Sequence, residues 1–124
     1  SSSYLERGVV TYSNASKIAL LNVPQEILIE HGAVSEPTAR RMAEGIRTAA
    51  GVDLGLSTTG IAGPTGAVPG KPVGTVYIAL AHASGTICRH CLFRRDRPKV
   101  KIAAAHTALM MLREYLLFHA GGDN

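Results

Sequence analysis

A short segment near the start of the sequence, Tyr12 to Lys17, places a phenol, two serines and a lysine at a predicted strand-to-helix junction. Gly8 to Ser13 has the β-branched and aromatic residues of a strand, and Ser13 or Asn14 can cap the helix that follows. Free helix N–H groups and a cationic side chain would then share one small volume, which suits an anion or a developing oxyanion. A partly buried lysine there would have its charged form disfavoured, so it could serve as a general base toward a hydroxyl nucleophile. A surface lysine on an ordinary capped helix fits the same pattern.

A second stretch, Thr58 to Gly74, is rich in glycine and proline and carries one charge, Lys71. Strand-like sequence lies on both sides, and a loop this long between buried strands is usually functional or disordered. Glycine lets backbone N–H groups approach a ligand, and such groups at the end of a strand can bind an anion. A long surface turn would have the same composition. Ser57, Thr58 and Thr59 stand at the mouth of the loop, but no serine in the sequence has the Gly-x-Ser-x-Gly context of a nucleophile elbow.

The two cysteines invite a metal or redox interpretation because they form Cys88-Arg-His-Cys91. The surrounding sequence alternates like a strand, in which residues three apart point to opposite faces, so both sulfurs could not reach one zinc ion. The five histidines are scattered without metal-ligand spacing. We therefore expect reduced, structural cysteines and no metal, with local roles for Asp53 and Asp96.

The composition is that of one globular domain of 124 residues, with 46% hydrophobic and 18% charged residues. No run approaches the roughly 18 apolar residues of a membrane span, and no basic-then-apolar leader opens the sequence, so we expect a cytoplasmic protein without a membrane partner. The net charge is +4, and part of the excess is a local basic cluster of Arg94, Arg95, Arg97, Lys99 and Lys101. Such a cluster favours anionic partners, from a nucleotide phosphate to nucleic acid, or forms a solvated turn and helix start. Six aromatic residues and no tryptophan argue against single-stranded nucleic acid as a partner.

The elements that must position these residues are helices and strands in succession. We expect helices over 15–22, 24–31 and 36–50, the last capped by Ser35 and ended by Gly51, and a final helix from about 96–99 to 119. Strands are expected over 8–13, 52–59, 73–82 and 86–93, the last two as a hairpin. The run 52–59 shows little strict alternation, which is typical of a strand covered on both faces. The final helix has a predicted apolar stripe of Val100, Ala103, Ala104, Thr107, Met111, Leu112 and Tyr115. This arrangement predicts a layered α/β domain.

Five blocks in order, GVVTYSNASK, EHGAVSE, TTGIAGPTG, GKPVGTVYIAL and FRRDR, closely resemble the CinA C-terminal domain family of bacteria. These are the competence/damage-inducible, PncC-type nicotinamide mononucleotide amidohydrolases. The resemblance covers about Ser1 to Leu117, so residues 1–124 are expected to form a single CinA C-terminal-like domain. It implies a three-layer α/β/α fold with a mixed β-sheet, found as a dimer or higher oligomer. It also implies a cofactor-free hydrolase that converts the carboxamide of nicotinamide mononucleotide to a carboxylate, giving nicotinic acid mononucleotide and ammonia in pyridine-nucleotide salvage.

The resemblance also assigns the candidate site residues. Lys17 would be the general base of a Ser–Lys pair and Tyr12 the supporting hydroxyl. The residues that would line the substrate pocket by backbone contacts are Thr59, Gly60, Ala62 and Gly63. Arg97 occupies the position of the family's Gly-Asp-Arg arginine and would face the substrate's phosphate, although Arg95 replaces the glycine of that motif.

The family carries a helix, a strand and a Glu-Ser-Cys-Thr-Gly-Gly motif before the position of Ser1, and the serine of that motif is the proposed nucleophile. The sequence contains no such motif. We therefore expect these residues to belong to a longer domain, to leave out a central strand of its sheet, and not to hydrolyse the amide alone. The alternative is a non-catalytic nucleotide-binding or interaction module of a competence or DNA-damage-inducible protein.

Overall fold

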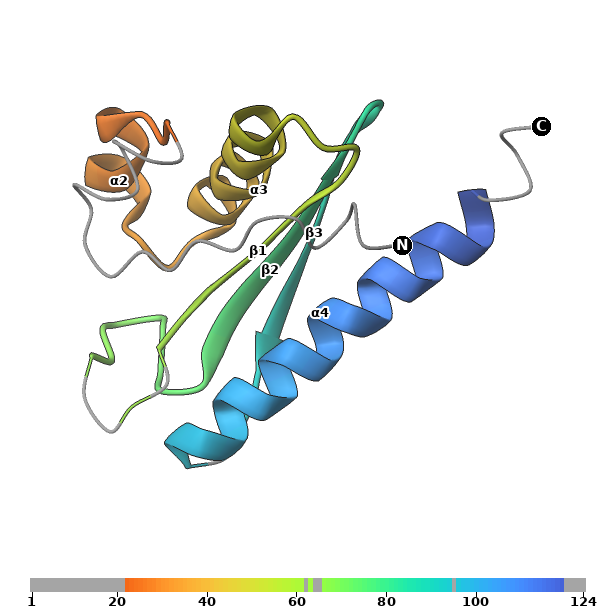
Figure 1. Ribbon diagram of the computed structural model, residues 1–124. Coiled ribbons are helices and arrows are strands. Elements are labelled where there is room, and N and C mark those ends of the chain that lie inside the picture. The colour runs from red at the N-terminus through yellow and green to blue at the C-terminus, as the bar shows by residue number, and fades with distance from the viewer. Residues whose placement is uncertain (1–21, 62, 64–65, 95, 120–124) are drawn as a thin grey trace.

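The computed structural model describes residues 22–61, 63, 66–94 and 96–119. Its elements are α2 (Gln25–His31), α3 (Glu36–Ala50), β1 (Gly55–Gly60), β2 (Thr75–His82), β3 (Gly85–Leu92) and α4 (Arg97–His119). The strands form one sheet in the order β1-β2-β3, with α2 and α3 over one face and α4 across the other (Figure 1). The predicted α/β class and its three layers are confirmed.

Both strand pairs are antiparallel, so no parallel pair of the expected mixed sheet lies among the described strands. The predicted hairpin is confirmed, because β2 and β3 pair from Thr75 with Leu92 to His82 with Gly85. The strand expected over 8–13 lies outside the described residues, as does all but the last residue of the helix expected over 15–22.

The two helices on one face begin and end where their capping residues predict. Gly32 ends α2 and donates its N–H to the Leu28 carbonyl at 2.9 Å. Ser35 caps α3 by accepting a hydrogen bond from the Thr38 N–H at 3.3 Å, and Gly51 ends α3 in the left-handed conformation. These signals are local to each helix end, and the predicted bounds of α3 are therefore correct.

Small residues bring α3 close to the sheet. Ala39 and Ala43 of α3 meet Ala79 and Ala81 of β2 in one buried cluster. Gly55 of β1 lies under the helix, where an added Cβ would come within 2.1 Å of the Ala43 carbonyl oxygen. The Ser57 hydroxyl donates to the Ala39 carbonyl at 2.7 Å across the same contact. This face of the sheet therefore depends on the absence of larger side chains.

Larger side chains fill the opposite layer, beneath α4. The buried residues of this cluster are Val76, Ile78, Val100, Ala104, Ala108 and Met111. Three of the seven residues in the predicted stripe belong to it, and Ala108 belongs to it as well although the stripe did not include it. At the start of the helix, the Asp96 carboxylate accepts from the Lys99 N–H at 3.2 Å, which is the local role expected for Asp96.

The strand expected over 52–59 was predicted to be covered on both faces, and this is wrong along most of β1. Burial alternates: Ser57 and Thr59 are buried toward α3, whereas Thr58 and Gly60 are exposed. The hydrophobicity pattern did not indicate that Ser57 and Thr59 are buried, because both are polar. Their hydroxyls donate hydrogen bonds to carbonyl groups instead. β1 also continues to Gly60, so the glycine- and proline-rich loop begins at Ile61 and not at Thr58.

Candidate functional site

The loop between β1 and β2 has an ordered base and an ordered tip. At the base, the Ile61 N–H donates to Thr75 at 2.8 Å and the Gly74 N–H donates to Ile61 at 2.6 Å, which extends the β1–β2 ladder. At the tip, Val68 and Lys71 exchange two backbone hydrogen bonds of 3.1 and 2.9 Å around Pro69 and Gly70. Proline followed by a glycine with φ of 81° is typical of a type II turn. The described base and tip of the loop are therefore both held by backbone hydrogen bonds.

Two glycines in this loop have no acceptable substitute. Gly63 is buried with φ of 83°, and an added Cβ would lie 2.5 Å from a methyl carbon of Val73. Gly74 has φ of 97°, and its Cβ would lie 2.1 Å from the Phe93 carbonyl oxygen. Positive φ is accessible to glycine at little cost, and the missing Cβ permits the close approach. Gly63 is consequently fixed in its left-handed conformation close to Val73.

Side chains from β1 and the loop bind the turn that joins α2 to α3. The Thr59 hydroxyl donates to the Ala33 carbonyl at 2.8 Å, and the Lys71 ammonium donates to the His31 carbonyl at 2.9 Å. Between them, the Gly32 carbonyl accepts hydrogen bonds from two hydroxyls at the N-terminal end of α3. Three consecutive carbonyl groups are thus satisfied by side-chain donors, so this turn and the loop are fixed relative to each other.

The start of α4 meets the loop from the other side. Arg97, its first residue, donates from Nη1 to the Gly63 carbonyl at 3.0 Å. The first turn of α4 contains no acidic residue, and Lys99 and Lys101 are exposed beside it. The Asp96 carboxylate already caps this helix start, and the exposed cations beside it favour an anionic ligand. Gly60, Gly63 and the start of α4 together form the candidate site.

The structure brings four of the seven predicted site residues into this region: Thr59, Gly60, Gly63 and Arg97. Tyr12, Lys17 and Ala62 lie outside the described residues, so their predicted roles stay predictions. Sequence reasoning missed the contribution of His31 and Ala33, whose carbonyl groups receive the side chains of Lys71 and Thr59. No sequence signal marks a backbone carbonyl as the partner of a distant donor, although both residues belong to the block EHGAVSE.

A family model described as the CinA C-terminal domain matches residues 1–116. The chain belongs to this family. It is 63% identical over 117 residues to a CinA-like protein of Syntrophus aciditrophicus (strain SB), covering 94% of this chain and 28% of that protein. It is 53% identical over 112 residues to a CinA-like protein of Anaeromyxobacter sp. (strain Fw109-5), covering 90% and 27% respectively. The chain therefore spans less than a third of the length of these curated relatives.

Solved structures of CinA proteins share this fold. The competence damage-inducible protein A (ComA) of Klebsiella pneumoniae subsp. pneumoniae MGH 78578 superposes with a TM-score of 0.85 at 38% identity, covering 89% of this chain and 68% of that one. The competence or damage-inducible protein from Enterobacter asburiae superposes with a TM-score of 0.83 at 37% identity, covering 88% of this chain and 69% of that one. Identity and shape agree, so the CinA assignment made from five sequence blocks is confirmed.

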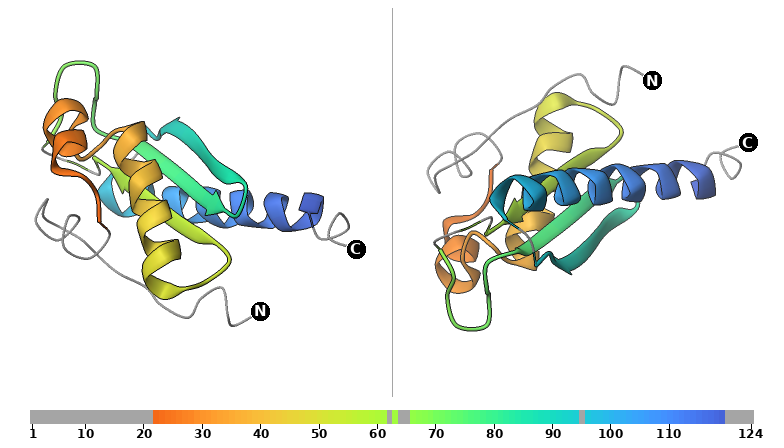
Figure 2. Two further views of the ribbon diagram at one scale, coloured as in Figure 1. Left: turned by 90° about the horizontal axis from the view of Figure 1, so that it is seen from above. Right: turned by 90° about the horizontal axis from the view of Figure 1, so that it is seen from below.

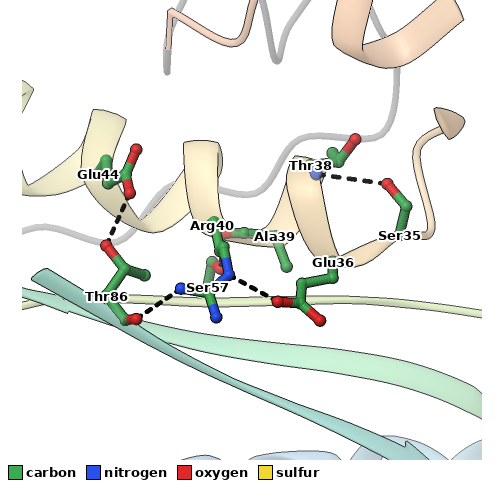
Figure 3. A network of polar contacts seen from close by, with 8 residues as sticks. All are labelled: Ser35, Glu36, Thr38, Ala39, Arg40, Glu44, Ser57 and Thr86. Atoms are coloured by element: carbon green, nitrogen blue, oxygen red, sulfur yellow. Dashed lines mark hydrogen bonds and ion pairs between the residues drawn. The ribbon is translucent and has the colours of Figure 1, made fainter. Parts of the chain in front are cut away.

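A polar network on the α3 face of the CinA domain joins α3 to the edge strand β3 (Figure 3). Arg40 donates from Nε to the Glu36 carboxylate at 2.8 Å and from Nη1 to the Thr86 carbonyl at 2.5 Å. The Thr86 hydroxyl donates to the Glu44 carboxylate at 2.7 Å. Each charged group in this network has a partner, and the described residues contain no cluster of three or more potential metal ligands. We interpret the network as structural.

The two cysteines point to opposite faces of β3, as predicted. Cys88 packs against the alanine cluster beneath α3, and Cys91 packs against the core beneath α4. Burial, reinforced by the negative charge of Glu36, raises the pKa of the Cys88 thiol from 9.0 to about 11. Burial also raises the pKa of the Cys91 thiol, against the opposing effect of Arg89. Both thiols are therefore poor nucleophiles at neutral pH.

A surface hollow of about 380 Å³ lies along the flank of α4. Its lining residues are Phe93, Lys99, Ile102, Ala103, His106 and Thr107. The Thr107 hydroxyl is already bonded to the Ala103 carbonyl at 2.9 Å. None of the predicted site residues lines this hollow.

Within the described part of the chain, no helix is long and apolar enough to cross a membrane.

Proposed function

We propose that this CinA domain binds nicotinamide mononucleotide and contributes to hydrolysis of its carboxamide, giving nicotinic acid mononucleotide and ammonia. The observation that carries the proposal is the buried Gly63 of the glycine-rich loop, held against the basic start of α4 by Arg97. A loop rich in glycine offers backbone N–H groups to a carbonyl or phosphate oxygen, and the neighbouring positive charge favours an anionic ligand.

The chemistry follows from the Ser–Lys pair that the family resemblance implies. A serine from the segment that precedes this sequence in the family attacks the carboxamide carbon while neutral Lys17 takes the hydroxyl proton. The tetrahedral intermediate releases ammonia after its nitrogen is protonated, and water then hydrolyses the acyl-serine ester to the carboxylate. Tyr12 donates a hydrogen bond that supports this proton transfer. Donors aimed at the intermediate's oxyanion supply the main electrostatic stabilisation.

The test is ammonia release from nicotinamide mononucleotide by the domain with the family's leading segment present. We expect turnover, and we expect Lys17→Ala to reduce it by at least about 100-fold, the usual contribution of a general base. Arg113→Ala is the control, because Arg113 is an exposed cation in the later part of α4, away from the candidate site. Retained turnover in Lys17→Ala would remove Lys17 from the mechanism. Light scattering on the same sample gives the oligomeric state, which the resemblance implies is a dimer or a higher oligomer.

A non-catalytic nucleotide-binding module is the second candidate, favoured by the exposed cations Arg94, Arg97, Lys99 and Lys101. Calorimetry and turnover separate the two functions. Mononucleotide binding with no ammonia release, even when the leading segment is present, would favour the module. DNA binding that weakens steeply with salt would instead indicate a nucleic-acid partner.

A further inference from the structure

Two cationic side chains connect the loop 61–74 to helices on opposite faces of the sheet. Lys71 reaches the C-terminal end of α2, and Arg97 reaches into the loop from the start of α4. We propose that Arg97 and Lys71 are positioning residues, which hold Gly63 and the loop tip Val68–Lys71 in place for the substrate. Only the identity of that substrate rests on the proposed function, because the two contacts exist without a ligand.

The loop depends on these contacts because its backbone bonds to the rest of the fold are concentrated at the base. Thr75 and Phe93 bond to the backbone of Ile61, Pro72 and Gly74. Among the described loop residues beyond the base, the bonds of Val68 and Lys71 are to each other. Arg97 and Lys71 therefore supply the hydrogen bonds that join Gly63 and the tip to other elements.

The two contacts oppose each other. Figure 1 and both views of Figure 2 place the loop at the end of the sheet near α2 and near the start of α4, while those helices lie on opposite faces. A loop held from one face alone could tilt toward that face. With both contacts present, the Gly63 carbonyl and the tip are each fixed before any ligand arrives. Such preorganisation reduces the entropy lost on binding.

Arginine and lysine suit these contacts because a charged donor to a carbonyl is stronger than a neutral one. Arg97 holds the carbonyl of Gly63, a residue whose φ of 83° favours glycine. Gly63 and Arg97 therefore act together: the glycine adopts the positive φ, and the guanidinium holds its carbonyl. An arginine that instead acted on the substrate's phosphate would leave the ligand-free loop unaffected when replaced, and this difference separates the two roles.

Hydrogen exchange measured by mass spectrometry on the ligand-free 124-residue chain tests the proposal first. We expect Arg97→Gln and Lys71→Gln each to speed exchange of amides in the segment 61–74 by about 5- to 30-fold, the factor associated with losing one such interaction. Arg94→Gln is the matched control, since Arg94 is exposed in the same basic cluster and makes no hydrogen bond within the described residues. Circular dichroism confirms that each variant is folded. Exchange in Arg97→Gln equal to that in Arg94→Gln would overturn the proposal.

Calorimetry with two ligands then separates positioning from phosphate contact. Nicotinamide mononucleotide and nicotinamide riboside differ only by the phosphate. A positioning role predicts that Arg97→Gln weakens both by the same factor, about tenfold, with Arg97→Lys in between. Loss confined to the mononucleotide would assign Arg97 to the phosphate and overturn the proposal. If the domain with the family's leading segment binds neither ligand, the proposed substrate is wrong, while the exchange measurement still decides the positioning role.

Discussion

Replacement of Gly55 by alanine tests how closely α3 lies against the sheet. The added Cβ would stand 2.1 Å from the Ala43 carbonyl oxygen and 2.9 Å from the Arg47 Cβ, where real Cβ contacts are essentially never under 3.0 Å. The nearest obstacle is helix backbone, so no side-chain rotation can relieve the contact. The helix must withdraw by roughly 1 Å to restore an ordinary distance.

The cost of that withdrawal can be estimated from the contacts it breaks. Overpacking a well-packed core costs about 2 kcal/mol. Stretching the 2.7 Å hydrogen bond from the Ser57 hydroxyl to the Ala39 carbonyl removes about 1 kcal/mol more. Alanine returns roughly 0.5 kcal/mol by restricting the unfolded chain. We therefore expect Gly55→Ala to lower the free energy of unfolding by about 2.5 kcal/mol and the Tm by about 10 °C.

Urea unfolding followed by far-ultraviolet circular dichroism measures this difference, with Gly51→Ala as the control. Gly51 also lies next to α3, with φ of 64°, but an added Cβ there meets nothing within 4 Å. Its replacement should cost about 1 kcal/mol, from the left-handed conformation alone. If Gly55→Ala were no more destabilising than Gly51→Ala, the close approach of α3 to β1 would be refuted.

Three further outcomes follow from the burial of Cys88 and from the hydrogen bond of Thr59. The pKa of about 11 at Cys88 means that alkylation by iodoacetamide at pH 8 should be about 100-fold slower in the folded chain than in urea; equal rates would contradict the burial of this thiol. Because folding raises that pKa, the Cys88 contribution to stability is complete below pH 9 and should decline as pH rises toward 11, which urea titrations at several pH values would detect. Thr59→Val should cost about 1–2 kcal/mol in the same unfolding assay, because the Ala33 carbonyl loses its hydroxyl donor, whereas Thr58→Val at the neighbouring exposed position should change stability by less than about 0.5 kcal/mol.

Features written into a few adjacent residues were predictable. The Ser35 cap and the Gly32 and Gly51 terminators fix the ends of α2 and α3 through hydrogen bonds to residues three or four positions away. The β2–β3 hairpin was predictable for the same reason, since two strand-like runs flank a short turn. The opposite orientations of Cys88 and Cys91 followed from strand geometry alone.

Features that join distant segments were not predictable. Ser57 and Thr59 read as the polar end of a strand, yet both are buried, because each hydroxyl finds a carbonyl acceptor 18 or 26 residues away. Arg97 read as a ligand for phosphate, and its contact with Gly63 spans 34 positions. Every residue has a backbone carbonyl, so the sequence does not indicate which carbonyl will accept a distant donor. Recognition of the family supplied the location of the candidate site, while its internal bonding needed the structure.

These hydrogen bonds determine which groups around Gly63 are available to a ligand. The Thr59 hydroxyl is directed to Ala33 and one edge of the Arg97 guanidinium is directed to Gly63, so neither is available in full for recognition. The backbone N–H groups of a glycine-rich turn are then the natural donors to a substrate oxygen. Backbone donors do not depend on side-chain identity, but they depend strictly on conformation. The residues that constrain such a site are therefore Gly63, which adopts the positive φ, and the side chains of Arg97 and Lys71, which hold the loop.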